Sequence, residues 1–175
     1  YAWRATRDSI FFDPESDLRD QQNAFMRDLG FRFTSLFGCP LTRLFLIPNF
    51  SFGFNTLLAG LPKTLKFAML ADDYPSLNYP VISRGFDFAL ISVTDKVEEN
   101  IYEYVQAHKP DVLLLSIVNY INGLKIDLSF IRKLKEDFPS LLIIADATQF
   151  LGTAPFDFDS AGFDAVGGSG YKWMM

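Results

Sequence analysis

Cysteine and histidine are almost absent from this sequence of 175 residues, which contains one of each, Cys39 and His108. A single cysteine excludes an internal disulfide, and one cysteine with one histidine cannot supply a multi-cysteine zinc site. We therefore expect no metal in this chain.

Positive charge is also scarce, because 16 Lys and Arg stand against 21 Asp and Glu, for a net charge of -5 at pH 7. A nucleic-acid backbone repels such a chain, and no basic run alternates with aromatic residues, so we expect no nucleic-acid partner. No apolar run approaches the roughly 20 residues that span a bilayer, and residues 1–4 lack the apolar core of a signal peptide. We expect no membrane association and a cytoplasmic location.

Phosphate-loop motifs are missing as well. No G-x-G-x-x-G or G-x-x-x-x-G-K-[ST] turn follows an apolar run that predicts a strand. Residues 167–170 are rich in glycine, but they precede Lys172 in the wrong order for a phosphate loop. These absences disfavour a nucleotide-binding domain.

What the chain does contain is a regular alternation of short apolar runs and helical patterns, in a composition of 49% hydrophobic residues typical of a globular domain. The patterns predict helices over residues 16–37, 52–61, 97–105 and 128–138. They predict strands over residues 44–47, 65–70, 88–92, 112–117, 141–145 and 165–168. Such alternation indicates an α/β fold with a mostly parallel sheet flanked by helices.

In sheets of this kind, ligands bind beyond the carboxyl ends of the strands. Polar residues follow the predicted strands at 49–55, 72–76, 116–123 and 146–149, and the last strand leads into residues 169–173. Taken singly, an aspartate there is often a helix cap and a lysine is usually solvated. Their order and spacing carry more information than any one of them.

The segment from Asp146 to Trp173 resembles the cofactor segment of a known family. It reads Asp146-Ala147-Thr148-Gln149, then Gly152, Pro155, Asp157, Asp164 and Ser169-Gly170-Tyr171-Lys172-Trp173. The pattern is similar to that of class V aminotransferases, cysteine desulfurases, isopenicillin-N-epimerase-like proteins and kynureninases, which are pyridoxal-5′-phosphate (PLP) enzymes of fold type I. The resemblance implies that Asp146 pairs with the pyridine nitrogen, Gln149 contacts the phenolic oxygen, and Lys172 holds the cofactor as an imine.

The chemistry of PLP explains these residue types. A buried carboxylate keeps the pyridine nitrogen protonated, so the ring can accept the electrons released when a bond at the substrate α-carbon breaks. A lysine amine can form an imine with the aldehyde, leave when a substrate amine replaces it, and then move the α-proton. Asp146 and Lys172 are the catalytic residues that the resemblance implies.

Two upstream segments extend the resemblance. Residues 49–55 resemble the turn that holds the cofactor phosphate at the start of a helix, which places Ser51 and Phe52 at the phosphate, although Ser51 suits a plain helix N-cap equally well. Tyr74 follows Asp73 where the family has an aromatic ring that stacks on the cofactor. The alternative for Tyr74 is a surface tyrosine beside a turn-forming proline.

Further positions match the family less closely. Ser169 and Tyr171 fall where relatives contact the phosphate. The loop from Ser116 to Gly123 resembles the one beneath the cofactor, but Ile117 and Tyr120 stand where desulfurases often carry His and Asn. Tyr120 is a weaker site candidate, and this departure counts against the detailed chemistry of desulfurases in this chain.

The resemblance implies an enzyme that acts on an amino acid or amine through an external aldimine, by transamination or epimerisation. A cysteine desulfurase or kynureninase-type lyase is the alternative, and Gln149 argues against a kynureninase, where His is expected. A non-catalytic PLP-fold interaction module is a second alternative, which the presence of both Asp146 and Lys172 disfavours. Because family members are longer and typically homodimeric, we expect residues 1–175 to be an incomplete PLP-binding large domain that lacks a carboxyl-terminal small domain and works as a homodimer.

Overall fold

The computed structural model describes residue 5 and residues 18–174. The chain divides into two compact units, Tyr1–Leu46 and Ile47–Met175. The first unit contains helix α2 (Leu18–Phe37) and the short 3-10 helix η1 (Leu41–Arg43). The helix predicted over residues 16–37 is thus confirmed from residue 18 onward, while residues 16 and 17 lie outside the described part of the chain.

The strand predicted over residues 44–47 is wrong, because this segment has no regular secondary structure. Leu44 and Leu46 line a hollow on the first unit together with Met26 of α2 and Leu41 of η1. Strands are stabilised by ladders of hydrogen bonds to neighbours, and the described residues include no strand paired with this run. The apolar residues at 44–47 therefore pack near a helix and do not form a strand.

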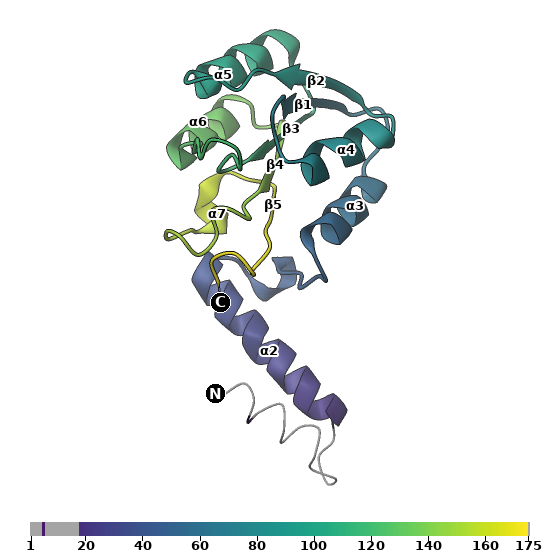
Figure 1. Ribbon diagram of the computed structural model, residues 1–175, viewed down its shortest axis with the longest axis vertical. Coiled ribbons are helices and arrows are strands. Elements are labelled where there is room, and N and C mark those ends of the chain that lie inside the picture. Colours follow the sequence, from purple (N-terminus) through teal and green to yellow (C-terminus); the bar gives the residue numbers. More distant parts are fainter. Residues whose placement is uncertain (1–4, 6–17, 175) are drawn as a thin grey trace. The chain divides into compact units, whose positions relative to one another are not determined.

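The second unit is built on one sheet of five parallel strands in the order β2-β1-β3-β4-β5 (Figure 1). Their bounds are Lys66–Leu70 for β1, Asp87–Ile91 for β2, Val112–Ser116 for β3, Leu142–Asp146 for β4 and Ala165–Gly167 for β5. Five of the six predicted strands are therefore confirmed, each within one or two residues. The predicted α/β class with a parallel sheet is also confirmed.

Five helices accompany the sheet in the described part of this unit. They are α3 (Phe50–Gly60), α4 (Pro75–Ser83), α5 (Val97–His108), α6 (Leu128–Asp137) and α7 (Phe158–Ala161). The sequence patterns predict α3, α5 and α6 but miss α4 and the four-residue α7. Helix α4 begins with Pro75, which suits a first turn because its missing N–H needs no partner there, and it contains a second proline, Pro80. Two prolines in nine residues concealed a helix whose Leu77 and Val81, four residues apart, are fully buried.

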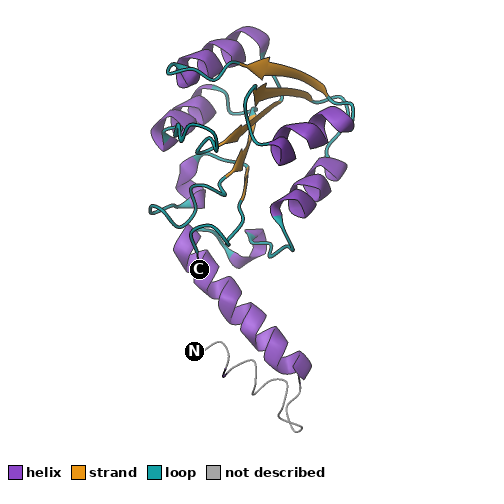
Figure 2. Ribbon diagram, viewed as in Figure 1, coloured by secondary structure: helices purple, strands orange, loops and turns teal. Residues whose placement is uncertain are grey.

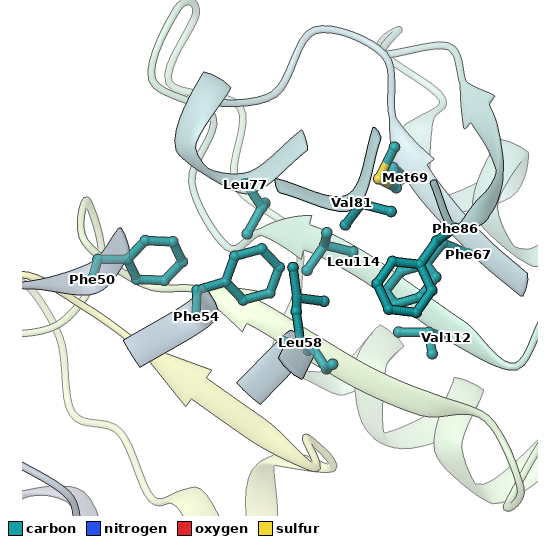
Figure 3. Packing of buried hydrophobic residues seen from close by; sticks show 11 residues of the cluster. Phe50, Phe54, Leu58, Phe67, Met69, Leu77, Val81, Phe86, Val112 and Leu114 are labelled. Carbon is teal, nitrogen blue, oxygen red and sulfur yellow. The ribbon is translucent and has the colours of Figure 1, made fainter. Parts of the chain in front are cut away.

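The helices cover both faces of the sheet, with α3 and α4 on one side and α5, α6 and α7 on the other (Figures 1 and 2). Every residue of the central strand β3 is buried, as expected for a parallel strand between two helical layers. The core on the α3 and α4 side is a continuous cluster in which rings of α3 lie over the sheet (Figure 3). Its members are Phe50, Phe54, Leu58, Phe67, Met69, Leu77, Val81, Phe86, Val112, Leu114 and Ile144.

The strand order fixes where a site can form. The chain runs from β1 outward to β2, then crosses back to β3 on the other side of β1. At such a reversal the two following loops diverge to opposite faces, which leaves a crevice at the carboxyl ends of the strands where open α/β sheets bind ligands. In this chain the reversal lies between β1 and β3, so residues 71–74 and 117–120 border it.

Candidate active site

Polar residues gather at the carboxyl ends of the central strands in the second unit. Asp146 is the last residue of β4, and its register partners are Ser116, the last residue of β3, and Gly167, the last residue of β5. Asp146 and Ser116 are both buried, at 6% exposure each. The two polar side chains therefore end adjacent strands at the same sheet edge.

Asp146 is a buried carboxylate that is held by its own loop. Its Oδ1 accepts the backbone N–H of Thr148 at 2.7 Å. Burial raises the pKa of Asp146 above its ordinary value of 3.8, the hydrogen bonds from Thr148 lower it, and the negative charge of Asp73 raises it again. No cationic side chain pairs with this carboxylate among residues 18–174. A cation supplied by a ligand would offset the cost of burying it.

A second buried carboxylate, that of Asp73, lies at the neighbouring strand ends. Its Oδ1 accepts the hydroxyl of Ser116 and, at 2.7 Å, the backbone N–H of Tyr74, while its Oδ2 accepts the backbone N–H of Ser116 at 2.7 Å. Burial raises the pKa of Asp73, and the hydrogen bonds from Ser116 and Tyr74 lower it. Asp73 thus joins the loop after β1 to the end of β3.

Two tyrosines lie at the same reversal point. The rings of Tyr74 and Tyr120 meet edge to face, with centroids 5.1 Å apart and an interplanar angle of 81°. Their side chains remain 43% and 45% exposed. The structure therefore places the predicted stacking residue, Tyr74, beside Tyr120 at the strand ends, with rings that a ligand can reach.

The amino end of α3 also lies near the carboxyl ends of the strands. Asn49 caps this helix by accepting the backbone N–H of Phe52 at 2.9 Å, so the N-cap is Asn49 and not Ser51. Phe50, the first residue of α3, packs so close to Gly167 that a Cβ on this glycine would lie 2.9 Å from the ring. The amino end of α3, with Ser51 and Phe52, thus lies near the end of β5.

The segment after β5 carries the predicted lysine. The backbone N–H of Ser169 donates to the hydroxyl of Thr148 at 3.1 Å, which joins this segment to the loop of Asp146 and Gln149. Tyr171 and Lys172 follow in a turn and are both exposed. The Lys172 ammonium lies 5.5 Å from the centroid of the Tyr171 ring. Its side chain is reachable by a ligand.

The predicted site residues therefore divide into two groups. Thr148 links the loop of Asp146 and Gln149 to Ser169. Tyr74 and Ser116 both donate to the Asp73 carboxylate, and Ser51 and Phe52 follow Phe50, which packs against Gly167. Tyr171 and Lys172 lie on the adjoining turn with their side chains in solvent. Sequence reasoning missed the bonding of Asp73, Ser116 and Thr148. Their place at or shortly after the ends of predicted strands was the one available signal.

Residues 5 and 18–174 hold no group of three or more His, Cys, Asp or Glu side chains placed to bind an ion. The expectation that the chain holds no metal stays a prediction. Across the same residues, none of the helices has both the length and the apolar character needed to cross a membrane.

Sequence comparison finds no matching family model and no matching curated protein. Structure comparison finds clear matches. A NifS-like protein from Rickettsia africae matches with a TM-score of 0.71 at 19% identity over 91% of this chain and 46% of its own. The cystine C-S lyase C-DES, in complex with cysteine persulfide, matches with a TM-score of 0.79 at 18% identity over 91% of this chain and 46% of its own.

A third match is histidinol-phosphate aminotransferase from Sinorhizobium meliloti in complex with pyridoxal-5′-phosphate. Its TM-score is 0.63 at 12% identity, over 77% of this chain and 38% of its own. The chain thus spans less than half the length of each of these three proteins. At such low identity the likeness establishes the fold, and it confirms the fold implied by the sequence pattern. This chain has the fold of part of the class V and related PLP-dependent enzymes of fold type I.

Proposed function

We propose that this chain is the PLP-binding part of an enzyme that acts on an amino acid or amine. The observation that carries the proposal is the buried Asp146 carboxylate at the end of β4, beside a segment that presents a reachable lysine amine. Bound PLP supplies an electron-accepting ring for bonds broken at the α-carbon of such a substrate. The side chains of this chain bind it, orient it and move protons.

Asp146 suits the ring nitrogen of the cofactor. Its carboxylate is buried, has no cationic partner in the described chain, and lies near a second carboxylate, that of Asp73. A protonated pyridine nitrogen would supply the missing positive charge and favour the ionised form of Asp146. The ionised carboxylate in turn holds the proton on that nitrogen.

Lys172 suits the covalent anchor and the proton carrier. Its amine is exposed on the turn that follows β5, so an aldehyde carbon can reach Nζ without unfolding the sheet. Lys172 Nζ would hold the cofactor aldehyde, and its free amine would serve as the base that takes a proton from the substrate α-carbon. The link from Ser169 to Thr148 holds this turn next to the Asp146 loop.

The phosphate has a separate set of candidate partners. The amino end of α3 offers N–H groups and the positive end of the helix dipole, and Ser51 adds a hydroxyl there. The Phe52 N–H is already used by the Asn49 cap, so Ser51 is the stronger of the two candidates. Ser169 and Tyr171 would contact the phosphate from the opposite segment, while Gln149 would contact the phenolic oxygen of the ring.

For the reaction we propose transamination or epimerisation, carried out by a cytoplasmic homodimer. A lyase is the second candidate, because the cystine C-S lyase shares the fold with a TM-score of 0.79. The two are separated by products. A transaminase converts an amino acid and an oxo acid into a new pair, whereas a lyase releases a fragment of the side chain, as sulfide or persulfide for a sulfur substrate.

The cofactor proposal is tested by incubating the full chain with PLP and recording its absorbance from about 300 to 500 nm before and after borohydride reduction. We expect a reducible band and a pyridoxyl mass on Lys172. Trypsin would then no longer cut after Lys172, so the peptide 136–172 would stay joined to the residues that follow it.

The matched variants are Lys172→Ala and Lys125→Ala, since both lysines are exposed and follow strands of the same sheet. The band should be lost in the first and kept in the second. A colourless wild-type chain, or a label spread evenly over several lysines, would contradict the proposal.

A further inference from the structure

The loops after β1 and β3 are fastened together by side chains that the proposed chemistry does not use. Asp73 is the first of these. Three donors bind its carboxylate, namely the N–H and hydroxyl of Ser116 and the N–H of Tyr74. Ser116 lies 43 positions further along the chain, so this bond joins segments brought together only by the fold.

Asn119 is the second. Its Nδ2 donates to the backbone carbonyl of Asp72 at 2.9 Å, and its Oδ1 accepts the N–H of Ile121 at 2.9 Å. Asn119 is only 3% exposed. One side chain thus shapes the loop after β3 and ties it to the loop after β1.

The hydrogen bonds of Asp73 and Asn119 set the positions of Tyr74 and Tyr120. Each tyrosine directly follows a tying residue, Asp73 or Asn119, and the rings touch each other edge to face. Because both side chains are almost half exposed, core packing alone does not fix the rings. Their positions depend on the backbone that carries them, and therefore on the hydrogen bonds of Asp73 and Asn119.

The chemistry of the tie requires a carboxylate. An ionised carboxylate accepts hydrogen bonds at both oxygens, which matches the three donors around Asp73. An asparagine would turn an amide nitrogen toward at least one of those donors. Burying a carboxylate without a cationic partner costs folding free energy. A buried carboxylate with all its hydrogen bonds made holds the groups around it in one arrangement.

We propose that Asp73 is a positioning residue that holds the Tyr74 ring against Tyr120, and so presents a fixed aromatic surface for the cofactor ring. Asn119 holds the other half of the pair. The role of this surface in stacking on the cofactor ring rests on the proposed function. The positioning of the Tyr74 ring does not, because the hydrogen bonds are present in the chain without a ligand. Its two parts can therefore be tested separately.

The first test uses the full chain without cofactor. In the wild type, NMR should detect cross-relaxation between the Tyr74 and Tyr120 rings and slow exchange of the Ser116 amide proton. Asp73→Asn should lose the ring contact and speed up the exchange. Asp95→Asn, which changes an exposed carboxylate in the loop after β2, should alter neither. An unchanged ring contact in Asp73→Asn would overturn the inference.

A milder variant guards against a folding failure. Ser116→Ala removes the hydroxyl donor and leaves the Asp73 carboxylate and the backbone N–H in place. Far-UV circular dichroism should show that it folds, and its ring contact should be weaker than in the wild type. A ring contact of wild-type strength in folded Ser116→Ala, together with one in Asp73→Asn, would assign the position of Tyr74 to other contacts.

The second test adds PLP. We expect Asp73→Asn to bind PLP roughly three- to tenfold more weakly, which is the worth of one aromatic stacking contact. It should also change the visible circular dichroism of the bound cofactor. In a Tyr74→Ala background the added loss from Asp73→Asn should be small, because the ring on which it acts is gone. Equal losses in both backgrounds would show that Asp73 does not act through Tyr74.

A wild-type chain that takes up no PLP would overturn the proposed function, and with it the stacking role of this surface. The ring-contact experiment would still decide whether Asp73 holds Tyr74. If wild type and Asp73→Asn instead bind PLP equally well and give the same visible circular dichroism, the proposed function stands and Asp73 is not a positioning residue.

Discussion

Ser116 and Asp146 face each other as the last register pair of β3 and β4, and Ser116 also binds the carboxylate of Asp73. One serine therefore stands between two buried carboxylates. Both carboxylates have a pKa that burial raises above 3.8, and the charge of Asp73 adds to the effect on Asp146. The strand ends hold negative charge that the chain itself does not neutralise with a cation among its described residues.

Asp146→Asn should stabilise the chain without cofactor at pH 7. The pKa of Asp146 is raised on folding, so its favourable contribution to stability is complete below 3.8 and is lost as the pH rises through the folded value. Asparagine removes that loss and can still accept the Thr148 N–H. Urea unfolding at pH 7 and at pH 4 should show a higher unfolding free energy for the variant at pH 7, and a smaller difference at pH 4.

The same variant should bind PLP more weakly and shift the absorbance band, because its neutral amide cannot hold a proton on the ring nitrogen, although the imine on Lys172 can still form. Asp95→Asn serves as the control and should change neither stability nor absorbance. A variant less stable than the wild type at pH 7 would mean that the Asp146 carboxylate has a stabilising partner.

Asn49 and Ser51 should separate helix capping from phosphate binding. Asn49→Ala removes the acceptor for the Phe52 N–H and should lower the unfolding free energy by about 1 kcal/mol. Ser51→Ala leaves that cap intact and should stay within about 0.5 kcal/mol of the wild type. If the proposed function holds, Ser51→Ala should nevertheless bind PLP more weakly. Thermal unfolding and PLP titration of both variants would detect a reversal of these roles.

Gly152→Ala should disturb the turn that carries Lys172. Gly152 has a φ of 93°, and a Cβ there would lie 2.9 Å from the backbone oxygen of Trp173. Gly123 also has a positive φ, 72°, but a Cβ there would meet nothing within 4 Å. We expect Gly123→Ala to destabilise by roughly 1–2 kcal/mol from backbone strain alone, and Gly152→Ala to destabilise by more.

Only Gly152→Ala should also reduce the yield of pyridoxyl label on Lys172 after borohydride. Equal labelling of the two variants would show that the turn tolerates the added methyl group, and that the position of Trp173 does not control Lys172.

Leu114→Ala should report on the core. Leu114 is fully buried in β3 within the cluster of Figure 3, and its truncation should lower the unfolding free energy by about 2–5 kcal/mol. Leu90→Ala, on edge strand β2 where the side chain is 50% exposed, should lower it by less than about 1 kcal/mol. Comparable losses measured by urea unfolding would contradict the placement of Leu114 in the buried core and of Leu90 at the exposed sheet edge.

Much of this architecture could be predicted from the sequence, because buried parallel strands are short continuous apolar runs. The run at 112–117 is an example, and it became β3. The run at 44–47 has the same appearance, yet the described chain places no paired strand beside it. A strand depends on its neighbours as much as on its own residues, and a sequence pattern does not report those neighbours.

Helix α4 shows the opposite error. The sequence patterns predict no helix at Pro75 and Pro80. Pro75 nevertheless occupies the first turn of α4, where a proline is tolerated, and burial of Leu77 and Val81 stabilises the helix around Pro80. Local propensity was overruled by tertiary packing.

For the site, the sequence predicted which residues follow the strands but not which of them bond to each other. The tie between Asp73 and Ser116 spans 43 positions, and that between Asn119 and Asp72 spans 47. No periodicity encodes such a contact. The order of the strands in the sheet creates it, and that order had to come from the structure.

These long spans also set when the site can exist during folding. Its residues lie at the ends of β1, β3, β4 and β5, and these strands become neighbours only after the segments that connect them have folded. Contacts between residues far apart in the chain form late because loop closure must precede them. An intermediate with its local helices formed would lack a binding surface, and a ligand held at the strand ends would slow unfolding of the whole sheet rather than of one segment.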